Sequence, residues 1–142
     1  MFQGSSALTL DAKGRMSIPA RYRDALISEE QGLLTLTRHP DGCLMIYPRR
    51  AWEQKRVQIA DLPMNARALQ RLLLGSAQDV ELDGAGRILV APELRTAASL
   101  TRDVMLLGVG THFELWDGAE WARRDIEDIE NLDPAVLEKI SF

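Results

Sequence analysis

The sequence contains an internal repeat, which limits the folds open to the chain more than any other feature. Residues 10–18 read LDAKGRMSI and residues 82–90 read LDGAGRILV, an offset of 72 positions. LMIY at 44–47 and FELW at 113–116 match at an offset of 69, and a tryptophan follows each five residues later. A connection that is three residues shorter in the second half accounts for the change of offset. The chain therefore consists of two copies of one structural unit.

The sequence pattern of each copy predicts the same order of elements: two short strands, a helix, two strands and a helix. Alternation of apolar and polar residues predicts strands at 8–10 and 16–18, joined as a hairpin by a turn at 11–14 in which Gly14 supplies a positive φ. The first copy continues with a helix over 20–26 and strands over 33–37 and 43–47. Further helices are predicted at 49–60, 65–74, 118–129 and from Asp133-Pro134 to about 139.

One copy alone cannot cover both faces of its strands, because about 70 residues with four short strands bury too little surface. Two copies can cover one another. The expected fold is α+β and mainly β: a pseudo-twofold, interlocked β-barrel of the double-psi or swapped-hairpin type, with helices outside. The predicted divisions are a first repeat at 5–50, connecting helices at 51–76, a second repeat at 77–120, and a C-terminal helix and tail at 121–142.

Composition excludes several classes of protein. The 142 residues include 17 basic and 21 acidic side chains, so the chain is not a uniformly cationic nucleic-acid binder. A single cysteine, Cys43, excludes an internal disulfide and a cysteine-rich zinc site, and we expect a reducing cytoplasm. No leader or long apolar run is present, so we expect no contact with a membrane.

Charge is distributed unevenly between the two halves. Residues 1–71 hold 11 basic and seven acidic side chains, whereas residues 72–142 hold six and 14. Such a difference is a weak signal by itself, because solvated surfaces often differ in charge. A basic first half on an acidic second half nevertheless suits an oriented contact with an anion, with the acidic part kept away from it.

The repeated turn carries the strongest functional signal. Each copy contains Asp-x-x-x-Arg, a spacing at which the carboxylate can accept bonds from turn amides and pair with the guanidinium. A structural role alone explains the aspartates equally well, so the predicted turn-structuring residues are Asp11, Gly14, Asp83 and Gly86. For Arg15 we favour a function, because basic side chains surround the first turn. The candidate anion-binding residues are Arg15, Lys13, Arg21, Arg23 and, in the second copy, Arg87.

These motifs closely resemble the MraZ family of bacterial transcriptional regulators. The resemblance extends from residue 1 to about residue 121 and rests on Met1-Phe2 with Gly4, DAKGR at 11–15, PARYR at 19–23, QRLLLGSA at 70–77, DGAGRI at 83–88 and FELW at 113–116. It implies tandem SpoVT-AbrB domains and a ring-shaped homo-oligomer of about eight to twelve subunits. It also implies sequence-specific binding to short direct repeats in the promoter of the division and cell-wall gene cluster. Members usually repress their own operon, which would place the protein in the cytoplasm, at the nucleoid.

The resemblance also assigns roles to residues. The DNA-contacting arginine of the family maps onto Arg15, with Arg87 as its counterpart in the second copy. Lys13 and either Arg21 or Arg23 become phosphate contacts, which would set affinity while the arginines at the turns set sequence choice. The loop at 37–42 and the tail after 121 leave the family pattern and receive no function. No cofactor, metal or small-molecule ligand is expected.

Two other classes of function compete with a DNA-binding regulator. One is an interaction scaffold or antitoxin-like module, in which the basic turn binds an acidic partner protein. The other is a small barrel enzyme, which would need a cleft of titratable residues that the sequence does not show. His39, His112 and Cys43 have no partners at a catalytic spacing and are expected to pack or to lie at the surface. We therefore expect no enzymatic activity.

Overall fold

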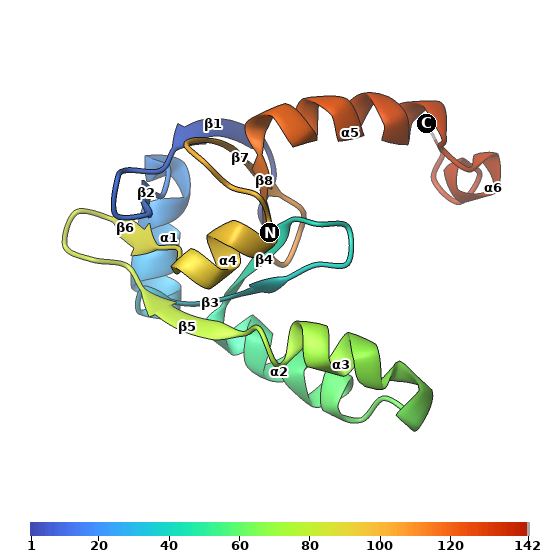
Figure 1. Cartoon of the computed structure of the whole chain (residues 1–142), viewed down its shortest axis with the longest axis horizontal. Helices are drawn as coiled ribbons and strands as arrows, with labels where there is room; N and C mark the ends of the chain where they lie inside the picture. The colour runs from blue at the N-terminus through green and yellow to red at the C-terminus, as the bar shows by residue number, and fades with distance from the viewer. Residues whose placement is uncertain (142) are drawn as a thin grey trace.

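The computed structural model describes residues 1–141, and the two halves contain the same elements in the same order (Figure 1). The first half comprises β1 (Ser5–Thr9), β2 (Arg15–Ser17), α1 (Ala20–Glu30), β3 (Leu33–Arg38), β4 (Leu44–Pro48) and α2 (Arg49–Ala60). The second half comprises β5 (Gln78–Glu81), β6 (Arg87–Leu89), α4 (Pro92–Ala97), β7 (Asp103–Gly108), β8 (Phe113–Asp117) and α5 (Gly118–Glu130). The 3-10 turn η1 (Met64–Ala66) and α3 (Arg67–Leu73) lie between the halves, and α6 (Pro134–Leu137) follows α5. The predicted order of elements is confirmed, although the last position of the predicted 121–142 segment lies outside the described residues.

The strands of the two halves interleave in two antiparallel sheets. One sheet has six strands in the order β1-β7-β8-β4-β3-β5, and the other is a ribbon of β2 and β6. Strand β1 pairs along its whole length with β7 of the second half, from Ser5 opposite Leu107 to Thr9 opposite Asp103. Strand β5 of the second half pairs with β3 of the first. Each half thus supplies the strand that covers an open edge of the other, as an interlocked pair of repeats requires.

The predicted hairpin between residues 8–10 and 16–18 is wrong in its strand pairing. The turn itself forms: the amide of Gly14 donates to the carbonyl of Asp11, and the amide of Asp11 donates to the carbonyl of Arg15, both at 2.9 Å. Beyond these bonds β1 pairs with β7 and β2 pairs with β6. The local sequence specifies a turn, but the pairing partner comes from the other repeat.

The predicted closed barrel is also not confirmed. Neither sheet closes on itself in the described part of the chain, so the fold is an interlocked α+β structure, mostly sheet with helices outside. The main core lies between the large sheet, the ribbon and helices α1 and α4. Its largest fully buried side chains include Met16, Ile88, Leu26 and Phe113. The ribbon is therefore fixed to the body of the protein by its inner face.

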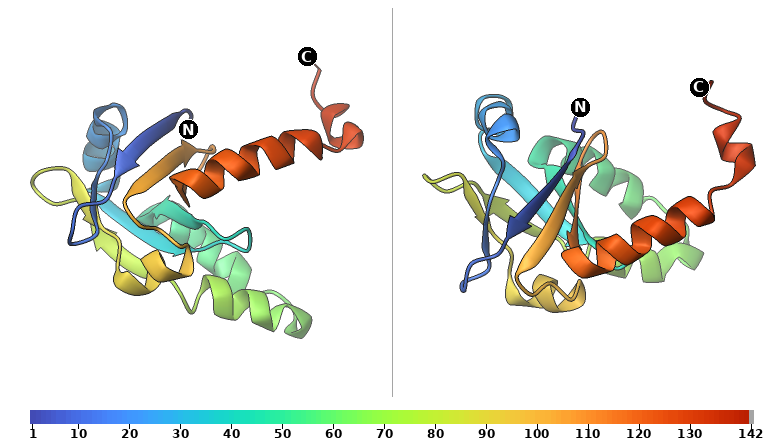
Figure 2. Two further views of the ribbon diagram at one scale, coloured as in Figure 1. Left: turned by 45° about the horizontal axis from the view of Figure 1, so that its top comes forward. Right: turned by 90° about the horizontal axis from the view of Figure 1, so that it is seen from above.

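A second, smaller core lies under α2 and α3. It contains Met45, Tyr47, Trp52, Ile59 and Leu73, and so attaches both helices to the outer side of β4. Helices α2–α3 and α5–α6 project from the core as two separate extensions (Figure 1), and Figure 2 shows α5 running away from the sheet toward the C-terminus. Across residues 1–141, no helix combines the length and the apolar character that crossing a bilayer demands.

Candidate nucleic-acid interface

The β2–β6 ribbon presents equivalent residues of the two repeats on one outer face. Its register places Met16 opposite Ile88, and both side chains are buried in the core. Because side chains alternate along a strand and cross-strand neighbours share a face, the flanking positions point outward. These outward positions are Arg15, Ser17, Arg87 and Leu89. The pseudo-twofold axis passes between Met16 and Ile88, so the two turn arginines emerge together.

The two arginines also share a groove. Arg15 and Arg87 line one cavity of about 460 Å³ with Asp11, Ser17 and residues 7–9 of β1. The cavity is open to solvent, and each arginine side chain is about one third exposed. The structure therefore brings together the candidate residues of both repeats that the sequence could relate only by their spacing.

Each aspartate fixes the direction of the arginine in its own turn. The Oδ1 atom of Asp11 accepts the amides of Lys13 and Arg15, both at 2.9 Å, and its Oδ2 atom accepts Nε of Arg15 at 2.7 Å. Asp83 makes the same three kinds of bond, with Nε of Arg87 at 2.9 Å. Within residues 1–141 these are the only side-chain bonds of the two guanidinium groups, so their terminal nitrogens are available to a ligand.

The same bonds keep both carboxylates ionised. The backbone amide of Arg15, with the guanidinium beside it, lowers the pKa of Asp11 to about 2. The amide of Arg87 lowers the pKa of Asp83 in the same way. Hydrogen bonds to the charged form of a carboxyl group favour that form. The ion pair in each turn therefore persists at neutral pH.

Two further arginines support the turns from the core side, and each contacts the turn glycine of the other repeat. Arg23 of α1 donates from Nη2 to the carbonyl of Ile18 at 2.7 Å, and its Nε packs against Gly86 where a side chain would begin. Arg95 of α4 donates from Nε to the carbonyl of Val90 at 3.0 Å, and the same atom lies 2.7 Å from the equivalent position on Gly14. We call these two contacts, Arg23 on Gly86 and Arg95 on Gly14, the crossed clamp.

The backbone crosses in the same manner. The amide of Ile18 donates to the carbonyl of Gly86 at 3.0 Å, and the amide of Val90 donates to that of Gly14 at 2.9 Å. Both glycines have a positive φ, 85° and 76°, and both are buried. A side chain at either position would strain the backbone and collide with the clamping arginine. The sequence shows the glycines and the equivalent arginines, but nothing in their spacing indicates that the contacts cross between repeats.

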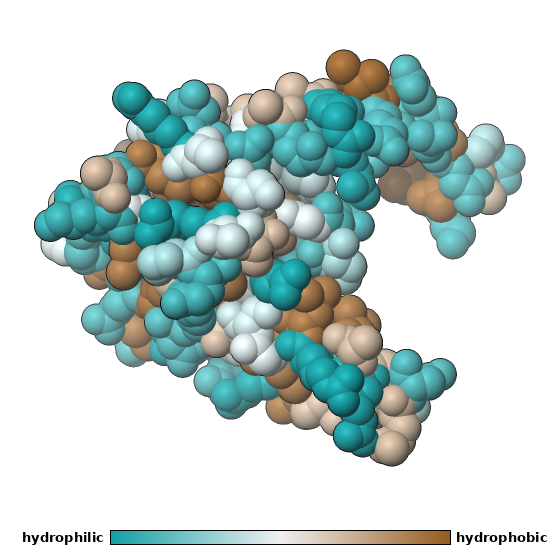
Figure 3. All heavy atoms as spheres, viewed as in Figure 1, coloured by the Kyte–Doolittle hydropathy of each residue, from teal (hydrophilic) through white to brown (hydrophobic). Residues whose placement is uncertain are grey.

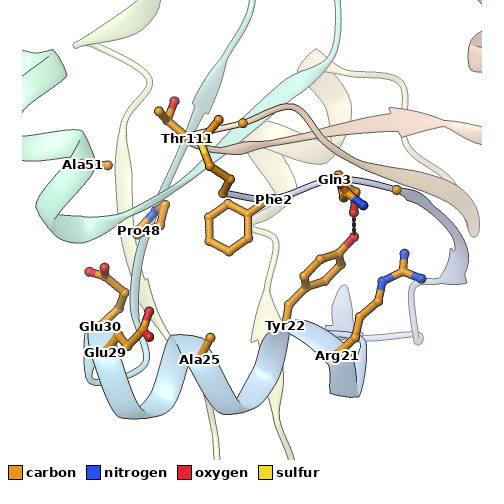
Figure 4. Close-up of a pocket in the computed structure, with 13 residues that line it drawn as sticks. Phe2, Gln3, Arg21, Tyr22, Ala25, Glu29, Glu30, Pro48, Ala51 and Thr111 are labelled. Carbon is orange, nitrogen blue, oxygen red and sulfur yellow. Dashed lines mark hydrogen bonds between the residues drawn. The ribbon is translucent and has the colours of Figure 1, made fainter.

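The other basic candidates are placed differently. Lys13 is exposed at the tip of the first turn. Arg21 donates to Oγ of Ser6 at 2.6 Å and lies over the ring of Tyr22, beside a pocket of about 560 Å³ that shares no lining residue with the ribbon groove (Figure 4). Arg23 is half-buried beneath the second turn, and its Nε has no hydrogen-bond partner in the described residues. Of these three candidates, Lys13 alone is an exposed residue of the turn itself.

Cys43 and His112, two of the residues considered for catalysis, pack against other side chains. Cys43 is buried, and burial raises the pKa of its thiol to about 12. The ring of His112 stacks on Tyr47 with 4.5 Å between centroids, and burial lowers the pKa of the imidazole. A thiol that stays protonated is a poor nucleophile.

Interleaved repeats with a duplicated Asp-Arg turn define a tandem-repeat protein that displays paired arginines on a fixed ribbon. The family model of the MraZ protein, described as antitoxin-like, matches the chain twice, over residues 1–74 and 73–133. Proteins named transcriptional regulator MraZ from Bordetella pertussis, Herminiimonas arsenicoxydans and Ralstonia pickettii are 69%, 60% and 58% identical over 142 residues, with all of this chain and all of each relative covered. The chain belongs to the MraZ family. This is a family of transcriptional regulators and not of enzymes, as the sequence predicts.

Proposed function

We propose that the chain is a sequence-specific DNA-binding regulator that reads bases with Arg15 and Arg87. The observation that carries this proposal is that both arginines, one from each repeat, line the same groove on the outer face of the ribbon. Each is held through Nε and keeps its terminal nitrogens available. A guanidinium oriented in this way can donate two bonds to O6 and N7 of guanine, and a two-stranded ribbon fits the major groove of DNA.

The aspartates contribute by preorganisation and not by attraction. An exposed arginine loses side-chain freedom when it binds, and this loss opposes association. Asp11 and Asp83 restrict the arginines before DNA arrives, so less freedom remains to be lost. A carboxylate near phosphate lowers affinity, however, and a cation must offset it. Lys13, at the tip of the first turn, is the best placed phosphate contact.

Arg21 and Arg23 rank below Lys13 as phosphate contacts. Arg21 would have to give up its bond to Ser6 to reach DNA, although its side chain is exposed. Arg23 would have to leave the crossed clamp, which would remove its bond to Ile18 and its support of Gly86. We assign Arg23 the role of holding the ribbon in place.

At the level of regulation, we propose that the sites are short direct repeats in the promoter of the division and cell-wall gene cluster, where the protein represses its own operon. Membership of the MraZ family supports this assignment. One ribbon contacts few base pairs, whereas a ring-shaped homo-oligomer presents several ribbons to repeated sites and adds their binding energies. The protein would then act in the cytoplasm, at the nucleoid.

The test is fluorescence anisotropy with a DNA fragment from upstream of the protein's own gene and a scrambled fragment of equal length, at several salt concentrations. We expect tight binding to the native fragment only, weakening as salt rises. Equal or absent binding to both fragments would overturn the proposal and favour an interaction scaffold. Arg38→Ala is the matched control for the removal of a turn arginine, because Arg38 is an exposed arginine at the far end of β3. The near end of β3 follows Gly32, whose carbonyl accepts the amide of Leu82 beside the second turn.

A further inference from the structure

The C-terminal arm, residues 125–140, is exposed along its whole length. Within residues 1–141, helix α5 is attached to the body only near its start, where Trp121 packs on Trp116 with 5.4 Å between centroids and Arg124 pairs with Asp41 at 3.4 Å. Beyond Arg124 the arm carries six large apolar side chains that are 43–63% exposed: Ile126, Ile129, Leu132, Val136, Leu137 and Ile140. Short isolated helices are marginal in water, and grouped apolar side chains mark an interaction surface.

A groove on the other extension has the complementary character. The α2–α3 groove has a volume of about 600 Å³ and is lined by Trp52, Arg56, Val57, Ala60, Leu74, Ala77 and Asp79. Most of these residues are apolar, and Val57 is 67% exposed. Figure 3 shows hydrophobic residues at the surface of both extensions of the molecule. The groove can therefore receive the apolar face of a helix.

The charges of the two surfaces are opposite. Residues 49–73, which form the helices beside the groove, hold six basic and two acidic side chains. The C-terminal arm holds six acidic side chains and one basic side chain. In a single chain the two extensions are well separated (Figure 1), so the arm does not fill the groove of its own chain. Complementary charge around complementary apolar surface identifies a second copy as the partner.

We propose that the C-terminal arm of one copy lies in the α2–α3 groove of a second copy. The apolar side chains of the arm pack against the groove, and its carboxylates face the basic side chains of α2 and α3. The contact joins two different surfaces, so each copy can donate an arm and accept another, and the assembly can continue around a ring. The inference rests on the proposed ring and specifies the surfaces that build it.

Two exposed apolar positions test each side of this contact. Ile126→Asp places a charge on the arm, and Val57→Asp places one in the groove; Ile27→Asp is the matched control, because Ile27 is 52% exposed on α1. Size-exclusion chromatography with light scattering measures the mass, and circular dichroism confirms the fold. We expect the wild type and Ile27→Asp to assemble, and the other two variants to run as single subunits of 15.9 kDa. Ile129→Asp provides a second arm variant with the same expected loss.

Mixing the two defective variants gives the sharper result. The Val57→Asp protein keeps an intact arm and the Ile126→Asp protein keeps an intact groove, so the mixture should form one-to-one dimers and nothing larger. Assembly of Val57→Asp by itself would show that the groove is not needed for the contact, and would overturn the inference. So would a monomeric wild type or a mixture that stays monomeric. Anisotropy on the upstream fragment, measured in parallel, judges the DNA-reading role of Arg15 independently of these outcomes.

Discussion

The two turns of the ribbon share one geometry and differ in their electrostatic surroundings. Both have the aspartate, the clamped glycine and the arginine held through Nε. The first turn adds Lys13 and is followed by Arg21, whereas Ala85 and Glu93 occupy the corresponding places in the second. The comparison separates two requirements of a recognition element. The backbone framework is needed in both copies, but the cations that attract an anion are needed in one.

The largest effect on DNA preference is expected when the arginine of one turn or of the other is removed. Arg15→Ala should abolish preference for the native fragment without loss of thermal stability, because within residues 1–141 its guanidinium hydrogen-bonds only to Asp11, in an exposed turn. Arg87→Ala should reduce the preference less, since no lysine flanks it. A bidentate arginine contributes about 1–3 kcal/mol of discrimination per site, and several ribbons multiply this. Anisotropy and thermal melting provide the readouts.

A parallel loss of DNA binding and melting temperature in Arg15→Ala would contradict this expectation. It would show that the arginine mainly supports the turn. Equal losses in the two variants would show that the cations around the first turn do not distinguish the repeats.

Alanine at the clamped glycines should break the framework common to both turns. Gly14→Ala and Gly86→Ala each impose a positive φ on a side chain, which costs about 1–2 kcal/mol, and also push Arg95 or Arg23 aside. Gly42→Ala is the matched control, because Gly42 has a φ of 97° and nothing within 4 Å of an added side chain. Urea denaturation should show the control destabilised by the backbone cost alone. Equal destabilisation of all three would mean that the crossed clamp adds nothing.

Exchanging the tip residues should sharpen the electrostatic difference. Lys13→Ala should weaken binding to native and scrambled DNA alike and reduce the magnitude of the negative slope of log affinity against log salt by about one, because one phosphate contact is lost. Ala85→Lys should strengthen binding to both fragments, as it gives the second turn the cation of the first. A change in preference between the fragments after Lys13→Ala would indicate that the lysine contacts a base.

The smallest effect concerns pH. Hydrogen bonds lower the pKa of Asp11 from 3.8 to about 2 in the folded protein, so the carboxylate stabilises the fold above pH 4 and this contribution disappears as pH falls toward 2. Asp11→Asn should remove that part of the acid dependence in urea titrations between pH 2 and 5. The pKa of Asp83 is also lowered, so Asp83→Asn should act in the same direction. An unchanged acid dependence in Asp11→Asn would contradict the hydrogen bonds that Asp11 accepts in the first turn.

Local sequence predicts the elements of this fold well. The helix expected at 49–60 begins and ends where α2 does, and the turns form where Asp11-Ala12-Lys13-Gly14 and its repeat predict them. Such features depend on residues within a few positions of one another. The helix predicted at 20–26 extends to Glu30, where Gln31 adopts a left-handed conformation that ends it.

Strand pairing and the crossed clamp could not be read in the same way. Both depend on contacts between residues 63 to 102 positions apart, and an alternating pattern is satisfied equally by a partner in the same repeat or in the other. The sequence identifies Arg23 as a basic residue near the turn, but its half-buried position under Gly86 follows from the interleaving. The groove shared by Arg15 and Arg87 follows from the register of β2 and β6.

Fusion of the two repeats in one chain gives the ribbon a direction. A symmetric dimer of identical turns would present the same surface after a half rotation, and its binding sites would be palindromic. Here the twofold axis between Met16 and Ile88 is only approximate, since a lysine occupies the tip of one turn and an alanine the other. Rotated by half a turn, the ribbon would offer DNA a different arrangement of charge. A surface of this kind distinguishes the two orientations of a site, which suits it to elements that all point the same way along the duplex.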